Sequence, residues 1–107
     1  LILIGHSNGG DMTMLFATKY PHLINKAISM DHRRMIMPRT EKPRLYTLRG
    51  CDYDADAGVL PTKQEQEQFH MKVVKLDGIT HSNMGENGTE EQHRLINQSI
   101  YGFLTQE

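Results

Sequence analysis

The stretch Leu1–Gly10, "LILIGHSNGG", decides the fold of this chain. Its first residues, Leu1–Ile4, are all apolar and have no polar face, so they predict a strand that is buried on both sides. The residues that follow place Ser7 between Gly5 and Gly9, and this glycine-rich stretch does not continue a strand. We therefore expect a sharp turn at Ser7, which holds the serine hydroxyl in place for chemistry.

Length and composition set the limits for the fold and for partners. With 107 residues the chain is long enough for one domain and too short for two. The formal net charge of −1 gives no reason to expect nucleic acid or an anionic membrane as a partner. No apolar run approaches the roughly 20 residues that a membrane span needs. The single cysteine, Cys51, excludes an intrachain disulfide and leaves the compartment open, with a cytoplasmic one favoured.

The rest of the chain alternates between strand and helix signals. Runs of β-forming residues predict three further strands, at Lys26–Met30, Arg44–Arg49 and Met71–Leu76. A helix is predicted over Asp11–Tyr20, with Met12, Leu15 and Phe16 on one face and Pro21 at its end.

Two capping boxes predict two more helices. Thr62 with Glu65 indicates a helix that starts near Pro61, and Thr89 with Gln92 indicates a final helix. Strands that alternate with helices imply right-handed crossovers. The sequence therefore predicts an α/β fold with a mainly parallel sheet of four strands and about three flanking helices.

A serine in a tight turn between a strand and a helix has a chemical use. The hydroxyl projects from the edge of the sheet, close to a helix N-terminus that favours the negative charge built up in acyl transfer. An ordinary glycine-rich turn is the alternative. A phosphate-binding loop is disfavoured, because no lysine follows at the position that such a loop requires.

Residues 1–21, "LILIGHSNGGDMTMLFATKYP", resemble the nucleophile elbow of the α/β-hydrolase superfamily. The resemblance implies that Ser7 is the nucleophile and that the backbone N–H of Asn8 is one donor of the oxyanion hole. It also implies that residues 1–107 are the C-terminal half of a single α/β-hydrolase domain and carry its last four strands. Only 12–14 residues separate the second and third predicted strands, so we expect no separate lid domain between them.

In that superfamily the chain order is serine, acid, histidine. His81 lies in the loop between the last predicted strand and the last helix, where the resemblance places the base. His6 flanks the serine, so it is a candidate for lining the pocket, with a purely structural role as the alternative. The histidines that fall at helix ends or on polar helix faces are expected to be solvated, namely His22, His70 and His93.

The acid has three candidates. The loop Cys51–Gly58, "CDYDADAG", follows the strand after which the family usually keeps its aspartate. Counting forward from Gly50 favours Asp52, whereas counting back from the following "GVLP" favours Asp56. We prefer Asp56, because it directly precedes the turn that leads into the next helix. Asp52 is the second choice and Asp31 the third, since some members carry the acid after the earlier strand.

The same loop also has spaced aspartates like the start of a calcium-binding loop. The calcium pattern needs Gly at its sixth position and Glu at its twelfth, where this sequence has Ala57 and Lys63. A solvated acidic loop with one working carboxylate is the better interpretation. We expect no metal and no cofactor.

The sequence thus predicts a serine hydrolase that cleaves an ester or related acyl substrate through an acyl-enzyme on Ser7. The expected partners are a small acyl substrate and the upstream half of the same domain, which the resemblance implies would supply the second oxyanion donor. The alternative is a non-catalytic protein with a hydrolase-like fold that binds a ligand or a partner.

Overall fold

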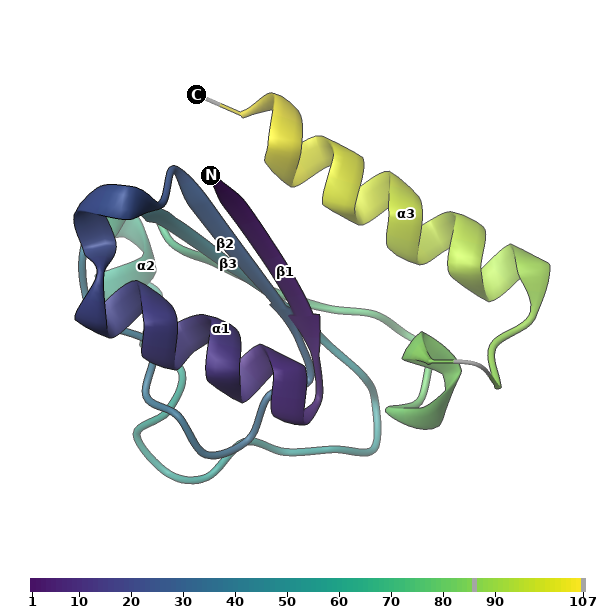
Figure 1. Cartoon of the computed structure of the whole chain (residues 1–107). Helices are drawn as coiled ribbons and strands as arrows, with labels where there is room; N and C mark the ends of the chain where they lie inside the picture. The colour runs from purple at the N-terminus through teal and green to yellow at the C-terminus, as the bar shows by residue number, and fades with distance from the viewer. Residues whose placement is uncertain (86, 107) are drawn as a thin grey trace.

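The computed structural model describes residues 1–85 and 87–106 and contains a four-stranded parallel sheet with the strand order β1-β2-β3-β4 (Figure 1). The strands are β1 (Ile2–His6), β2 (Lys26–Met30), β3 (Arg44–Arg49) and β4 (Lys72–Lys75). All three pairings are parallel. The predicted parallel α/β architecture is therefore confirmed, and the second and third strands have the predicted bounds.

Three helices flank the sheet. The helices are α1 (Asn8–Lys19), α2 (Lys63–Phe69) and α3 (Glu90–Thr105), with α1 and α3 on opposite faces (Figure 1). Two apolar clusters fill the two interfaces, because alternate residues of a strand point to opposite faces of the sheet. The cluster that involves α1 contains Met14, Ala17, Ala27 and Leu45, and the one that involves α3 contains Ile28, Tyr46, Ile96 and Phe103.

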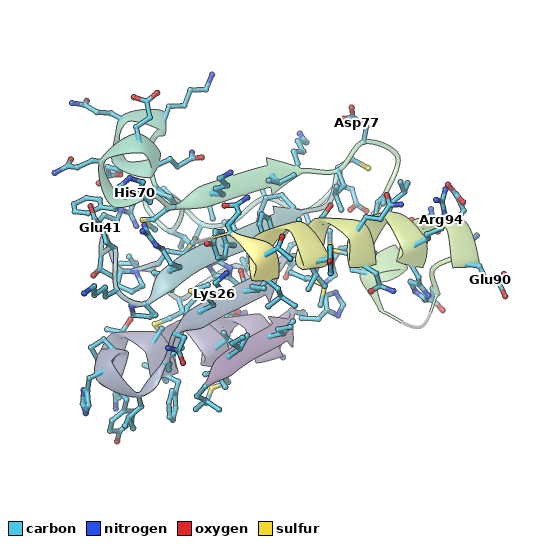
Figure 2. The ribbon with its side chains drawn as sticks, turned by 90° about the horizontal axis from the view of Figure 1, so that it is seen from above. Lys26, Glu41, His70, Asp77, Glu90 and Arg94 are labelled. Atoms are coloured by element: carbon cyan, nitrogen blue, oxygen red, sulfur yellow. The ribbon has the colours of Figure 1, made fainter. Side chains whose placement is uncertain are left out.

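Both predicted capping boxes are present. Thr62 caps α2 and Thr89 caps α3. The hydroxyl of each threonine accepts from the backbone N–H three residues later, and the side chain of that later residue accepts from the backbone N–H of the threonine. At the other end of α3, Lys26 Nζ donates to the carbonyl oxygens of Phe103 and Leu104, at 2.7 and 2.9 Å. Lys26 lies near that end of the helix in Figure 2. A lysine from β2 thus satisfies the terminal carbonyls of α3.

The helix α1 differs from its prediction in start and in phase. It begins at Asn8, directly after the turn, and Met12 is 62% exposed. The tight turn brings Gly10 against the sheet, where a Cβ atom would lie 3.2 Å from the Cβ of Ser29. Residues three and four positions apart lie on one face of a helix, so the face of Gly10 that packs on the sheet also contains the buried residues Thr13, Met14 and Ala17.

The prediction that the first strand is buried on both sides is wrong. Ile2 and Ile4 are 47% and 45% exposed, although Leu3 between them packs into the α1 cluster. The reason is that β1 lies at the edge of the sheet, while α3 contacts β3 on the face to which Ile2 and Ile4 point.

Candidate active site

Ser7 stands alone between β1 and α1 in a strained backbone conformation, with φ 58° and ψ −120°. Such angles cost free energy for any residue with a Cβ, and residues that adopt them cluster at functional sites. Two backbone hydrogen bonds hold the turn, from Ser7 N to Met30 O at 2.9 Å and from Asp11 N to Ser7 O at 3.1 Å. Gly5 is required for its closure, because a Cβ there would lie 2.2 Å from the carbonyl oxygen of Gly9.

His81 lies in the loop after β4, immediately before a short 3₁₀ helix at Ser82–Met84. Its Nε2 is 3.1 Å from Ser7 Oγ, and 74 residues separate the two along the chain. Its Nδ1 is 3.1 Å from Asp31 Oδ2. A carboxylate only accepts, so Nδ1 donates to Asp31 and Nε2 is left to accept from the serine hydroxyl. This is the tautomer that a general base needs.

Asp31 follows β2 and is fully buried. While one carboxylate oxygen faces His81, the other accepts from the backbone N–H of Gly50 at 2.7 Å. Gly50 has to be glycine, because a Cβ there would lie 2.7 Å from Asp31 Oδ2 and 3.0 Å from His81 N. The C-terminal ends of parallel strands lie at the same edge of the sheet. Ser7, Asp31 and His81, which follow β1, β2 and β4, therefore meet at that edge.

The carboxylate beside His81 Nδ1 is that of Asp31, the third choice, and not that of the preferred Asp56. Asp56 is half-exposed and pairs with Arg33 across 3.2 Å. The second choice, Asp52, accepts from the backbone N–H of His81 at 2.8 Å and so positions the loop rather than the ring. Counting residues along the loop failed because the loop is long enough to pass over the site.

The acidic loop contributes an aromatic ring that sequence reasoning missed. Tyr53 stacks on His81, with ring centroids 3.7 Å apart and planes inclined by 19°. His6 lies on the same histidine, with centroids 5.0 Å apart, and its Nε2 donates to the carbonyl oxygen of His81 at 3.1 Å. The imidazole of His81 is thus held by ring contacts as well as by hydrogen bonds. The sequence signal for this contact is the tyrosine between Asp52 and Asp54, in a loop where only the aspartates were considered.

Asp11, in the first turn of α1, anchors the segment that follows Asp31. Its Oδ1 accepts from the backbone N–H groups of Arg34 at 2.8 Å and Met35 at 2.7 Å, with a longer contact to Arg33. Partial burial alone would raise the pKa of Asp11, but the three amides together outweigh it and hold the pKa below its usual range. The turn that carries Asp31 is therefore tied to the helix that follows Ser7.

A buried polar network lies next to Asp31. His32 Nδ1 is 2.6 Å from Ser29 Oγ, which donates to Thr47 Oγ1 at 2.7 Å. Arg49 Nη1 also donates to Thr47 Oγ1, at 3.4 Å, and Arg49 Nε lies 3.7 Å from Asp31 Oδ1. Burial, followed by the charge of Arg49, lowers the pKa of His32 to about 4. His32 is therefore neutral at physiological pH. The sequence analysis did not identify the other members of this network, Ser29, Thr47 and Arg49.

The remaining candidates lie as follows. Asn8 is the first residue of α1, so its backbone N–H has no partner within the helix and is available for an oxyanion. His22 and His70 are exposed, and His70 lies beside Glu41 near the end of α2 (Figure 2). His93 Nε2 donates to the carbonyl oxygen of Gly85 at 2.8 Å, so it holds a loop.

Other kinds of site have less support. Within the part of the chain that the structure describes, His, Cys, Asp and Glu side chains nowhere gather in threes as metal ligands would. In the same residues, no helix has the length and apolarity to cross a membrane. A groove of about 690 Å³ lies between α2 and β4, and its lining includes neither Ser7 nor His81 nor Asp31.

No protein-family model matches the chain, and neither a curated protein nor a solved structure shows significant similarity to it. The part of the chain that the structure describes is a small α/β domain with a four-stranded parallel sheet and three helices.

Proposed function

We propose that this protein is a serine hydrolase of the α/β-hydrolase type, which cleaves an ester or related acyl substrate through an acyl-enzyme on Ser7. The observation that carries the proposal is the hydrogen-bonded series Ser7 Oγ, His81 Nε2, His81 Nδ1 and Asp31 Oδ2, with both links at 3.1 Å. A serine, histidine and aspartate with this geometry support nucleophilic catalysis on several unrelated folds.

The backbone strain at Ser7 supports the same proposal. A serine at φ 58° is maintained at a free-energy cost, and the turn presents its hydroxyl beside the N-terminus of α1. The chain order of serine, acid and histidine, after β1, β2 and β4, agrees with the order in the superfamily that the sequence resembles. The acid follows β2, as in some members, and not the next strand, after which the family usually keeps it.

The reaction proceeds in two halves. Ser7 Oγ attacks the acyl carbonyl carbon while His81 Nε2 takes the hydroxyl proton, and the tetrahedral intermediate collapses as the bond to the leaving group breaks. His81 returns the proton to the leaving alcohol. Water then attacks the acyl-enzyme with His81 as base again, which releases the carboxylic acid and restores the serine.

Asp31 keeps the imidazole in the required tautomer and stabilises the imidazolium that forms in each half-reaction. The N–H of Asn8 and the N-terminus of α1 would stabilise the oxyanion. No step requires a metal or a cofactor.

A fluorophosphonate probe tests the proposal, because it reacts covalently with activated serines. The full-length protein is expected to be labelled at Ser7, and Ser7→Ala should abolish labelling and lower ester turnover by at least about 10⁴-fold. Ser99→Ala is the matched control, since Ser99 lies partly exposed on α3 and its hydroxyl donates to Leu95 O. A folded wild-type protein that is not labelled would instead favour the non-catalytic alternative.

A further inference from the structure

Arg49, the last residue of β3, is an arginine in the interior, with only 6% of its side chain exposed. A buried guanidinium keeps its charge and is stable only beside a partner. Within the described residues its one ion-pair partner is Asp31, whose Oδ1 lies 3.7 Å from Arg49 Nε. Its Nη1 also donates to Thr47 Oγ1, at 3.4 Å, while Nη2 is buried without a partner among the described residues.

Asp31 divides its two oxygens between two tasks. Oδ2 faces His81, whereas Oδ1 faces the N–H of Gly50 and the guanidinium of Arg49. The side chain is fully buried, so water does not share the charge. The donors on Oδ1 therefore help to set the direction in which Oδ2 points, and the guanidinium compensates the charge of the carboxylate.

The charge balance of this cluster depends on Arg49. With it, an ionised Asp31 and the guanidinium sum to zero, and His81 can rest neutral. Without it, the buried carboxylate would either take up a proton itself or draw one onto His81, because an uncompensated buried charge is costly. The first outcome weakens the orientation of the ring, and the second removes the base that Ser7 needs.

Other titratable groups surround the pair without replacing it. Burial lowers the pKa of Arg49, and the charge of Asp31 opposes this most strongly, ahead of Asp11, Asp54 and Tyr53. These groups come from α1 and from the loop after β3. His32, from the segment after β2, is neutral and contributes no charge at physiological pH. Asp31 is thus the main electrostatic partner of Arg49.

We propose that Arg49 is a positioning residue of the candidate site: it keeps Asp31 ionised and aimed at His81, and so keeps His81 neutral before the reaction. This rests on the proposed function as far as turnover is concerned. The Arg49–Asp31–His81 arrangement can also be measured without turnover.

The test compares Arg49→Gln and Arg49→Lys in the full-length protein, with rates divided by the concentration of fluorophosphonate-labelled sites. For Arg49→Gln, kcat should fall about 10-fold or more with little change in KM. The acidic limb of its kcat/KM profile should move to higher pH. Arg49→Lys should retain most of the wild-type profile. Thr47→Val is the matched control, because it removes a buried partner of Arg49 that does not contact Asp31.

A second measurement does not require activity. A hydrogen-bonded imidazole N–H proton gives a low-field NMR signal, and the His81 signal should persist in Arg49→Lys and weaken in Arg49→Gln. The proposal is overturned if Arg49→Gln keeps the wild-type pH limb and the NMR signal while losing only thermal stability. An equal shift of the limb in Thr47→Val would overturn it as well. Absence of labelling in the wild-type protein would contradict the proposed function alone, since the NMR signal would still test Arg49.

Discussion

Asp31 Oδ2 lies 3.1 Å from His81 Nδ1, although 50 residues separate the two along the chain. Asp31 is fully buried, while His81 is about one-fifth exposed at 21%. The contact thus joins an interior carboxylate to a ring that reaches the surface beside Ser7.

Asp31→Asn should lower the rate of acylation by about 10⁴-fold, because an amide does not hold His81 in the tautomer that accepts a proton. Asp56→Asn should change the rate little, since it disturbs only a surface pair with Arg33. Burst kinetics with an activated ester measures both. A large loss in Asp56→Asn with a mild one in Asp31→Asn would contradict the geometry.

Tyr53→Leu should lower kcat by about 3- to 10-fold, because it removes the ring that stacks on His81 at 3.7 Å. Tyr53→Phe is the matched control and should stay close to wild type, since it keeps the ring. Steady-state ester hydrolysis at saturating substrate gives the comparison. Equal losses in the two variants would assign the effect to the hydroxyl and not to stacking.

Gly5→Ala should destabilise the protein by about 1–3 kcal/mol or prevent the turn from closing, because the new Cβ would lie 2.2 Å from Gly9 O. Gly9→Ala is the control, since no atom lies within 4 Å of a Cβ at that position. Urea denaturation followed by circular dichroism measures both free energies of unfolding. A harmless Gly5→Ala would mean that the turn is more open than described.

Asp11→Ala should lower the free energy of unfolding by about 1–3 kcal/mol, because it leaves backbone amides of residues 33–35 without their acceptor. Hydrogen exchange should speed up at these amides first. Asp77→Ala is the matched control, because Asp77 is exposed on the loop after β4 (Figure 2). Unchanged exchange at Arg34 and Met35 would contradict the anchoring role.

The stability of the protein should fall as the pH drops from about 6.5 to about 4, because the pKa of His32 is lowered from 6.5 to about 4 in the folded state. The unfolded chain binds the proton at the higher pH, so acid favours unfolding through this window. The full effect is on the order of 3 kcal/mol.

Urea denaturation at several pH values measures this dependence. His32→Asn should flatten it, whereas His22→Asn, at an exposed position, should leave it unchanged. An unaltered pH dependence in His32→Asn would show that other groups cause the loss.

The sequence by itself determined the local features. The strands Lys26–Met30 and Arg44–Arg49, the capping boxes at Thr62 and Thr89, and the tight turn at Ser7 were all predicted from neighbouring residues. Each depends on interactions within a few positions: β propensity, a side chain bonded to the backbone three residues away, or the absence of a Cβ.

The tertiary structure alone decided which carboxylate faces His81. Parallel strands end at one edge of the sheet, so the sequence limited the acid to the aspartates after β2 and β3, Asp31 among them. The choice depends on the path of each loop in space, on the glycine at position 50 that lets Asp31 approach, and on the buried Arg49 that compensates its charge. These contacts join residues 18 or more positions apart, and no local pattern in the sequence encodes them.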